Sequence, residues 1–401
     1  MFLEIVIAIG LGIGLGIITG LAPGIHINAV SVILVSLSGT LLHFPALYIG
    51  VVIVSMGITH TFLDTIPSIF LGAPDPEKAL AVLPGHRLLL AGKGFEAVKL
   101  TIIGSLFSLI GCMFLVPIFL LLSPLLYTWI QPFIGIFLIF ISFFMIIKEP
   151  SREQKIHGVV IFFLSGILGY LVLNFPSLHE PLFPLLSGLF GVSLLLVSLS
   201  EINVIPTQKI TNKIWIGKKG LIKSISASVI SGALAGFLPG LGSSQAAILA
   251  LSLVREAGIY TFLIIVGGIN TVNFVFSLVT FYAINKARNG AIVAMTKIIP
   301  QIPFPQLLLL LTVALIAGCI ATIVTLQLTR VFMEMITRIN YKACSIVIIL
   351  FIVGMIWYSS SIMGIIVLGI STLLGVAGQL AGIKKSLMMG CLLVPVIIYF
   401  I

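Results

Sequence analysis

Long apolar runs separated by short polar loops make up most of the chain. The runs near 46–72, 100–123, 258–284 and 304–328 each supply the roughly 20 apolar residues that a helix needs to cross a bilayer. Backbone polar groups in lipid must be satisfied within the segment itself, so such runs predict helices. Further apolar runs lie near 133–147, 158–174, 183–200, 343–357, 362–380 and 386–401. The pattern predicts an all-α, polytopic protein that crosses the cell membrane several times.

Two more apolar segments are each interrupted by a Pro-Gly pair, residues 3–42 near Pro23 and residues 224–254 near Pro239. Proline removes a backbone donor and glycine tolerates positive φ, so one helix ends and another begins there. Such breaks are tolerated at membrane depth only inside protein or beside a wet cavity. We expect each segment to form a broken helix or helical hairpin, with the two tips close together near the bilayer midplane. A kinked helix with a packing glycine is the alternative.

The two halves of the chain follow the same order of features. After each break comes a span that opens with Gly-Ile and small polar residues, 57–61 in the first half and 268–273 in the second. This order predicts two structural repeats, with residues 1–200 as the first transmembrane repeat, 201–223 as a basic cytoplasmic loop and 224–401 as the second repeat. Paired interrupted segments point to the binding site of a transporter.

Loop charge predicts the orientation of these repeats, because cytoplasmic loops carry more Lys and Arg than external loops do. All the basic loops lie on one side of the membrane if each Pro-Gly segment is a hairpin that enters and leaves on the same side. In that arrangement the two repeats are inverted relative to each other. That arrangement places Lys286, Arg288 and Lys297 in an external loop, against the charge rule. We predict inverted repeats despite this conflict. The basic loops are 148–157, 201–223, 330–342 and 384–385.

Composition excludes several classes of protein. Of the 401 residues, 60% are hydrophobic and 8% are charged, whereas a soluble domain carries roughly 25% charged residues. The net charge of +10 comes largely from loop residues, so it predicts membrane orientation and no nucleic-acid partner. The four cysteines form no CxxC pair, which predicts no metal site. The absence of HExxH and GxSxG patterns predicts that the chain is not an enzyme.

The helices that restart after the breaks are candidate anion sites. Their first N–H groups have no partner within the helix, and a helix N-terminus carries about +0.5 charge. Neither broken segment contains Lys or Arg before Arg255, so helix dipoles are predicted to supply most of the positive potential. Asn270 and Asn273 share one helix face, where they could bind substrate or sodium, or only join helices. The predicted substrate-binding residues are Pro23, Gly24, His26, Asn28, Pro239, Gly240, Gly242, Ser243, Ser244, Gln245, Asn270 and Asn273.

Asp64 is the candidate ion-coupling residue. It lies within an apolar run, and an ionisable group at membrane depth is a functional hypothesis by default. His60 lies one helical turn earlier on the same face, and a His–Asp pair suits a proton relay. The alternatives are that Asp64 sits at the water boundary and that the pair is only a structural hydrogen bond. H+ or Na+ is the expected coupling ion, and no other cofactor is expected. Arg87, in the polar loop, could clamp a carboxylate or anchor the loop.

Three motifs resemble the large permease subunit family of the tripartite tricarboxylate transporters. The first is GLAPGIH at 20–26, the second is GALAGFLPGLG at 232–242, and the third is PDPEKALAVLPGHRLLLAGKGFEA at 74–97. In the third motif, Pro84-Gly85 stands where the family has Asp-Gly. The chain also departs from the family in being shorter and in having Ile25-His26 where many members have small residues.

The resemblance implies ion-driven uptake of a small organic anion, a di- or tricarboxylate. It also implies two partners, a small membrane subunit and an extracellular substrate-binding protein. A homodimer is a further open arrangement. The alternative function is a translocase (flippase) for a lipid phosphate such as a polyprenyl phosphate carrier, because the same helix-end chemistry would hold a phosphate.

Overall fold

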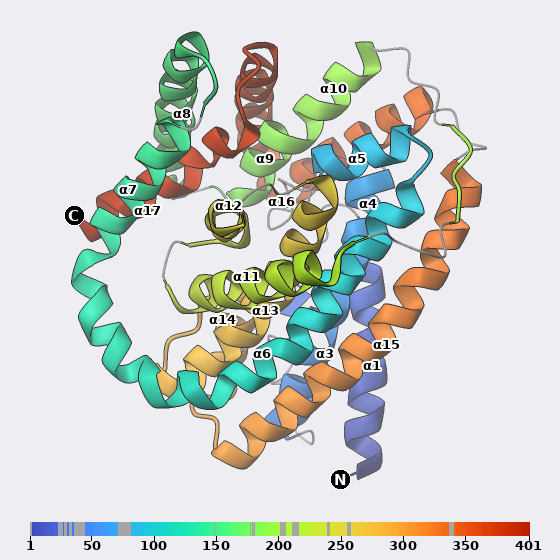
Figure 1. Ribbon diagram of the computed structural model, residues 1–401, viewed down its shortest axis with the longest axis vertical. Helices are drawn as coiled ribbons and strands as arrows, with labels where there is room; N and C mark the ends of the chain where they lie inside the picture. Colours follow the sequence, from blue (N-terminus) through green and yellow to red (C-terminus); the bar gives the residue numbers. More distant parts are fainter. Residues whose placement is uncertain are drawn as a thin grey trace.

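The computed structural model describes the chain except for residues 1, 23–26, 28–29, 32–33, 36–44, 71–81, 148, 177, 179–180, 201–205, 211–215, 239–240, 255–257 and 337–340. The described part contains helices and no strand, as the sequence predicts (Figure 1). Eight of its helical segments are long and apolar enough to cross a membrane. The helices are α1 (Phe2–Leu21), α3 (Ala46–Leu63), α4 (Thr65–Phe70), α5 (Val82–Leu90), α6 (Gly94–Ile130), η1 (Gln131–Phe133), α7 (Ile134–Ile147), α8 (Arg152–Leu173), α9 (Leu182–Leu186), η2 (Ser187–Val192), α10 (Ser193–Ser200), α11 (Lys218–Phe237), α12 (Ser243–Leu253), α13 (Ile259–Ile284), α14 (Gly290–Thr296), α15 (Phe304–Ile336), α16 (Tyr341–Leu380), η3 (Lys385–Met389) and α17 (Gly390–Phe400).

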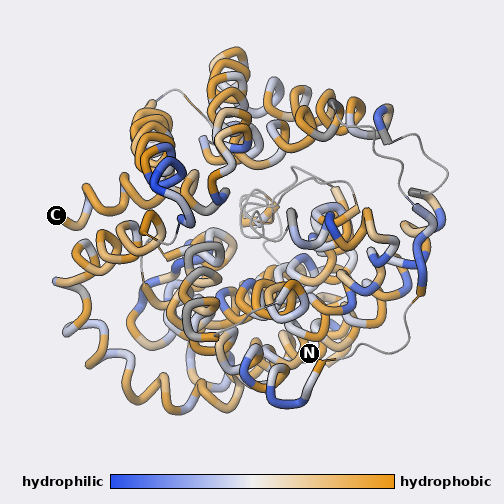
Figure 2. The backbone as a smooth tube through the Cα atoms, turned by 45° about the horizontal axis from the view of Figure 1, so that its top comes forward, coloured by the Kyte–Doolittle hydropathy of each residue, from blue (hydrophilic) through white to orange (hydrophobic). Residues whose placement is uncertain are grey.

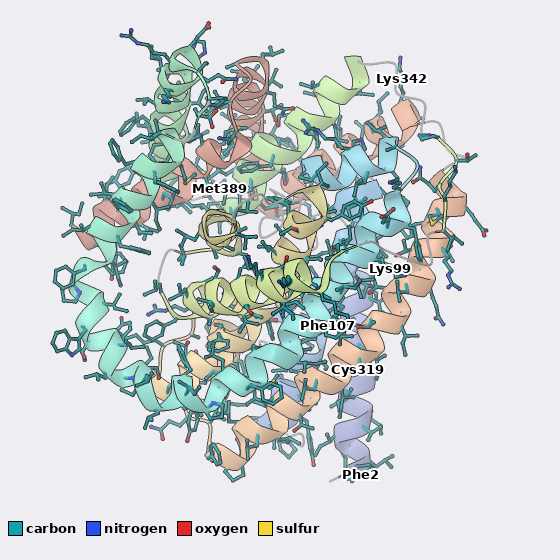
Figure 3. The ribbon with its side chains drawn as sticks, viewed as in Figure 1. Phe2, Lys99, Phe107, Cys319, Lys342 and Met389 are labelled. Carbon is teal, nitrogen blue, oxygen red and sulfur yellow. The ribbon has the colours of Figure 1, made fainter. Side chains whose placement is uncertain are left out.

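The surface of the helix bundle is apolar. Hydrophobic residues follow most of the length of the helices (Figure 2). Phe2, Phe107 and Cys319 are labelled in Figure 3, and all three are exposed, on α1, α6 and α15. Exposed apolar side chains of this kind suit contact with lipid tails. The prediction of a multi-pass membrane protein is confirmed.

The run at 183–200 does not form the single span that the sequence predicts. The chain there forms α9, a π-helical turn η2 and α10, and the apolar part covers only Leu182–Val197. Pro184 lies inside α9, where it lacks the N–H of a regular helix. Ser371 Oγ of α16 donates to the Pro184 carbonyl at 3.2 Å, so a neighbouring helix binds an acceptor in this irregular segment. The interruption is therefore held by packing against α16.

Two buried helices, α3 and α13, cross at the centre of the fold. The Thr61 and Thr271 hydroxyls are 3.1 Å apart, and Gly57 lies against the ring of Phe274. Because residue numbers rise along α3 where they fall along α13, the two helices run in opposite directions. This crossing agrees with inverted repeats, and the repeats themselves stay a prediction.

Glycines bring α1 against α3 and α11 against α13 in similar ways. A Cβ at Gly16 would meet the side chain of Thr59 and the backbone of α3, and a Cβ at Gly236 would meet Phe276 and the backbone of α13. Each glycine has a second small residue four positions earlier on the same face, Gly12 or Gly232. Small residues at this spacing let helix backbones approach closely in membranes. The segment before each Pro-Gly break is therefore held firmly against a central helix.

The crossing of α6 and α13 depends on the absence of a side chain at Gly104. A Cβ there would meet the backbone of Ile264, and Ser105 Oγ donates to the Gly267 carbonyl at 3.0 Å. We expect Gly104→Val to lower the free energy of unfolding by about 2–3 kcal/mol, because the two backbones must separate. Thermal unfolding of the detergent-solubilised protein measures this loss.

Gly10 on α1 is the matched control. A Cβ at Gly10 would meet nothing within 4 Å, so Gly10→Val should stay within about 0.5 kcal/mol of the wild type. Equal melting temperatures for the two variants would contradict the close approach of α6 and α13.

Candidate functional site

The second Pro-Gly segment forms two helices with a break between them. Helix α11 ends at Phe237, Leu238 is extended, and α12 begins at Ser243 after the extended residue Gly242. In Figure 1, α12 is seen nearly along its axis while α11 lies across the view, so the chain changes direction sharply. Gly242, the residue that precedes the first turn of α12, supplies no side-chain cap. The predicted helix break in 224–254 is confirmed, although Pro239 and Gly240 themselves lie outside the described residues.

The first Pro-Gly segment is described only in part. Helix α1 ends at Leu21, whereas Pro23, Gly24, His26 and Asn28 lie outside the described residues. Ile27 is buried, and its side chain approaches Gly57 of α3, which also lies against Phe274 of α13. The stretch just after the first break therefore reaches the crossing of the two central helices.

The start of α12 is anchored to the same part of α13. The side-chain amide of Asn273 donates from Nδ2 to Ser243 Oγ at 3.0 Å, and both residues are buried. Ser244 and Gln245 follow in the first turn of α12, and only their backbone is described. Ile27, which follows the first break, approaches Gly57 of α3, and Ser243, which follows the second, contacts Asn273 of α13. The approach of the two Pro-Gly tips themselves stays a prediction, because Pro23, Gly24, Pro239 and Gly240 lie outside the described residues.

Asp64 is enclosed by protein. It ends α3 just before α4 begins at Thr65, and it is only 2% exposed. Asn270 Nδ2 donates to Asp64 Oδ2 at 3.2 Å, and Thr65 Oγ1 lies 3.5 Å from Asp64 Oδ1. Protein therefore covers Asp64, while its depth relative to the water boundary of the membrane stays a prediction. A buried carboxylate needs hydrogen bonds or a countercharge, and Asn270 supplies one such bond from the opposite helix.

His60 is buried one turn before Asp64 and joins α3 to α1. Its Nδ1 lies 3.1 Å from Thr19 Oγ1 near the end of α1, and the tautomer decides which atom donates. His60 therefore lies close to the first break, whereas Asp64 contacts α13. The two residues of the predicted relay each hold a different neighbouring helix against α3.

One turn of α13 carries both predicted asparagines, and each has a different partner. Asn270 contacts the Asp64 carboxylate, and Asn273 contacts Ser243 at the start of α12. Asn270 Oδ1 is buried and accepts no hydrogen bond within the described part of the chain. An unpaired buried acceptor costs about 1–3 kcal/mol. An oxygen of this kind beside a carboxylate is suited to a bound cation.

The polar loop around Arg87 does not converge on these residues. Arg87 is exposed on α5, while the neighbouring His86 is buried with Nδ1 3.1 Å from the Ile69 carbonyl. Lys93 Nζ donates to the Tyr260 hydroxyl at 3.4 Å, which raises the pKa of Lys93. These contacts attach the loop to α4 and to the start of α13, and they make Arg87 a surface cation in the described structure.

Sequence reasoning missed a cation at the second break. Arg288 Nε donates to the Phe237 carbonyl at 3.1 Å, at the last residue of α11. Arg288 therefore adds a positive side chain at this break, which the sequence-based expectation of helix dipoles alone did not include. The signal in the sequence was the conflict with the charge rule, since Arg288 belongs to the loop that was predicted to be external.

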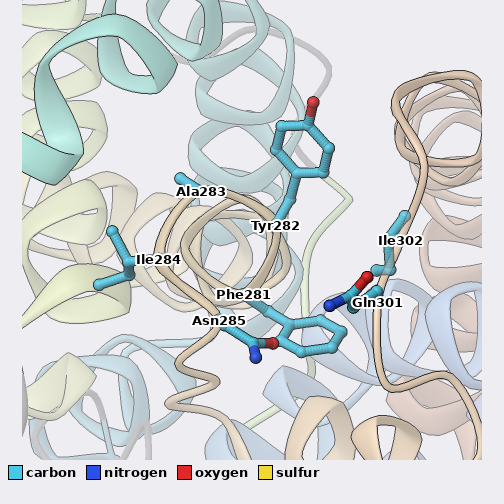
Figure 4. Close-up of a pocket in the computed structure, with 7 residues that line it drawn as sticks. All are labelled: Phe281, Tyr282, Ala283, Ile284, Asn285, Gln301 and Ile302. Carbon is cyan, nitrogen blue, oxygen red and sulfur yellow. The ribbon is translucent and has the colours of Figure 1, made fainter.

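A shallow cavity of about 350 Å³ opens at the end of α13, lined by Phe281, Asn285, Gln301 and their neighbours (Figure 4). Asn285 lies 15 residues beyond Asn270 on the same helix, which is roughly 20 Å along the axis at 1.5 Å per residue. The cavity contains none of the predicted site residues, so we place the candidate site at the α3–α13 crossing on the chemistry of its side chains. Among the described residues, no group of three or more His, Cys, Asp or Glu could hold a metal ion.

Comparison with known proteins gives two matches that span nearly the whole chain. The model of the tripartite tricarboxylate transporter TctA family matches residues 6–390. An uncharacterised protein of Methanocaldococcus jannaschii is 32% identical over 399 residues, which cover 96% of each chain. No solved structure matches the chain.

Proposed function

Because the chain belongs to the tripartite tricarboxylate transporter TctA family, we propose that it is the permease of an ion-coupled carrier for small organic anions, with di- or tricarboxylates as the substrate class. The family is one of transporters, and the eight apolar helical segments among the described residues make the chain a multi-pass membrane protein. We place it in the cell membrane, working with a small membrane subunit and an extracellular substrate-binding protein.

The proposed anion site lies at the start of α12. Ser243 opens the helix with no side-chain cap, so the first N–H groups of α12 are available to an anion. Ser243 Oγ accepts a hydrogen bond from Asn273, which leaves the Ser243 hydroxyl proton free to point at another acceptor. Ser244 and Gln245 continue this turn, and the residues around the first break, including His26 and Asn28, complete the site in this proposal.

The proposed cation site lies at Asp64. The carboxylate, the unpaired Oδ1 of Asn270 and the hydroxyl of Thr65 are buried oxygens close together on two central helices. Oxygen ligands of this kind bind hard cations such as Na+, and a buried carboxylate also takes up a proton. His60, one turn away, is the residue that would pass a proton toward the first break.

The single observation that carries the proposal is the short connection between these two sites. Asn270 and Asn273 lie three residues apart on α13, and they bind Asp64 and Ser243 respectively. A change of charge at Asp64 reaches Asn270 directly, and any rotation or shift of this turn moves Asn273 and the start of α12 with it. The arrangement supports coupling between cation binding and anion binding, because two sites are coupled when they bias one shared element.

Transport by the purified protein tests the proposal. Proteoliposomes loaded with unlabelled citrate or succinate should take up the labelled anion by exchange, and an inward Na+ or H+ gradient should drive accumulation. Co-reconstitution with the small subunit and the binding protein, where neighbouring genes encode them, keeps the assembly complete. Empty liposomes give the background.

Failure of every di- and tricarboxylate in the complete assembly would reject the proposed substrate class. Gradient-independent movement of a polyprenyl phosphate between leaflets, in the absence of carboxylate exchange, would instead establish the lipid-phosphate translocase.

A further inference from the structure

We propose that Arg288, assisted by Lys286, forms a cationic site that binds an anionic carboxylate or phosphate group beside the second Pro-Gly break. The inference rests on the proposed function for the position of the anion at the start of α12. It adds a charged side chain to a site that otherwise contains only helix N–H groups, hydroxyls and amides.

The loop after α13 is folded back so that it places Arg288 at the break. Asn285 ends α13 in the left-handed conformation, with φ of 54°, and turns the chain. The backbone N–H groups of Arg288 and Asn289 both donate to Ser277 Oγ, at 2.9 and 2.7 Å, two turns before the end of the helix. Asn289 then caps α14 by accepting from the N–H of Ala291. Three hydrogen bonds therefore fix the backbone at and just after Arg288.

Two nitrogens of the Arg288 guanidinium differ in their partners: Nε is bound at the break, and Nη2 has no acceptor among the described residues. Nε donates to the carbonyl of Phe237, which is the last residue of α11 and lies two residues before Pro239. Nη2 is buried and donates to no acceptor within the described chain. A buried charged donor without a partner is strongly destabilising unless a ligand completes it. The guanidinium is therefore held at the break by one nitrogen while another remains for an anion.

Aromatic side chains surround this charge. The Arg288 guanidinium carbon lies 5.7 Å from the centre of the Tyr127 ring, and Lys286 Nζ lies 4.6 Å from the same centre. Lys286 Nζ also donates to the Tyr127 hydroxyl at 2.9 Å. The rings of Tyr127 and Phe237 are in edge contact, with centroids 5.9 Å apart. Arg288 is half-buried and Lys286 is exposed, so the two cations together form a positive patch beside the ring of Tyr127.

Capping of α11 does not account for this arrangement by itself. A cation near a helix C-terminus is favourable, and one hydrogen bond from Nε to Phe237 already supplies that contact. A helix cap needs neither the folded-back loop nor a second cation, Lys286, on the same aromatic ring. The planar guanidinium group of an arginine can donate to both oxygens of a carboxylate or phosphate. An anion would therefore supply the acceptor that Nη2 of Arg288 lacks among the described residues.

The inference also accounts for the conflict in loop charge. Lys286, Arg288 and Lys297 belong to a loop that was predicted to be external, where basic residues are disfavoured. Lys286 and Arg288 are bound at Tyr127 and Phe237, so their placement serves the second break. Lys297 is exposed in the same stretch of chain, which makes it the matched control cation.

Anion-dependent thermal stabilisation of the purified, detergent-solubilised protein tests the role of Arg288. The probes are citrate, succinate and inorganic phosphate, titrated against the wild type, Arg288→Gln, Arg288→Lys and Lys297→Gln. We expect the half-saturating concentration of the stabilising anion to rise about tenfold or more in Arg288→Gln. Arg288→Lys should lie between Arg288→Gln and the wild type, because lysine keeps the charge without the fork. Lys297→Gln should stay within about twofold of the wild type.

The melting temperature without anion separates a binding role from a structural one. If Arg288 only caps α11, Arg288→Gln lowers this baseline and leaves the half-saturating concentration unchanged, which overturns the inference. Absence of stabilisation of the wild type by all three anions also overturns it. Stabilisation by phosphate alone that is lost in Arg288→Gln supports the inference while it rejects the carboxylate substrate of the proposed function.

Discussion

Asp64→Asn is expected to abolish accumulation of the substrate against a gradient while exchange of substrate across the membrane continues. The substitution keeps the size of the side chain and removes its charge, so the buried site next to Asn270 can no longer attract Na+ or take up a proton. An amide at this position still fits beside the Asn270 side chain, so the protein should fold. We expect gradient-driven uptake of labelled citrate or succinate in proteoliposomes to fall by about tenfold or more, which corresponds to a loss of about 1.4 kcal/mol or more of cation binding.

Glu153→Gln is the matched control for this prediction. Glu153 is an exposed carboxylate in the first turn of α8, so its neutralisation should leave accumulation unchanged. Separate imposition of a Na+ gradient and a pH gradient on the wild type identifies the coupling ion. Accumulation by Asp64→Asn at the wild-type level would show that the cation binds elsewhere.

The sequence was sufficient to predict the helical class and the second helix break. Apolar runs predict helices directly, because in lipid the backbone N–H and C=O groups find hydrogen-bond partners only within their own helix. The Pro239-Gly240 pair predicted a helix break, and the structure has one, since α11 ends at Phe237 and α12 begins at Ser243. The approach of the two Pro-Gly tips stays a prediction, and the described residues show Ile27 at Gly57 of α3 and Ser243 at Asn273 of α13.

The partners of the polar residues could not be predicted in the same way. Asp64 and Asn270 are 206 residues apart, and Asn273 and Ser243 are 30 apart, so these pairs depend on how the helices cross. A sequence places Asn270 and Asn273 on one helix face, but it does not say which neighbouring helix each one meets. The structure adds that one turn of α13 separates the two contacts.

Arg288 shows the limit of local reasoning about charge. Loop membership and the positive-inside rule treat a basic residue as an orientation signal. The fold instead returns Arg288 along α13 to Ser277 and attaches its guanidinium to Phe237. That return follows the left-handed turn at Asn285, and an asparagine of this kind can mark a helix end without showing where the chain goes next.

Ser243→Ala is expected to weaken substrate binding by about tenfold, because it removes a hydroxyl donor from the start of α12 at the proposed anion site. A hydrogen bond to a charged group is worth about 1.5–3 kcal/mol, and 1.4 kcal/mol corresponds to a factor of ten in affinity. Asn273 Nδ2 occupies an acceptor position of Ser243 Oγ at 3.0 Å and so orients the hydroxyl proton away from Asn273. Asn273→Ala should therefore have a smaller effect, since it loosens the hydroxyl without removing it. Calorimetry on the purified permease with citrate or succinate measures both affinities.

Ser142→Ala is the matched control, because Ser142 Oγ donates only to the Leu138 carbonyl of its own helix, α7. Its affinity should equal that of the wild type. Ser243→Thr keeps the hydroxyl and should retain most of the binding.

Combining Ser243→Ala with Asp64→Asn then measures the connection through α13, because two independent sites give additive changes in free energy and coupled sites do not. Strict additivity would leave the two sites unconnected, and wild-type affinity in Ser243→Ala would place the anion away from the start of α12.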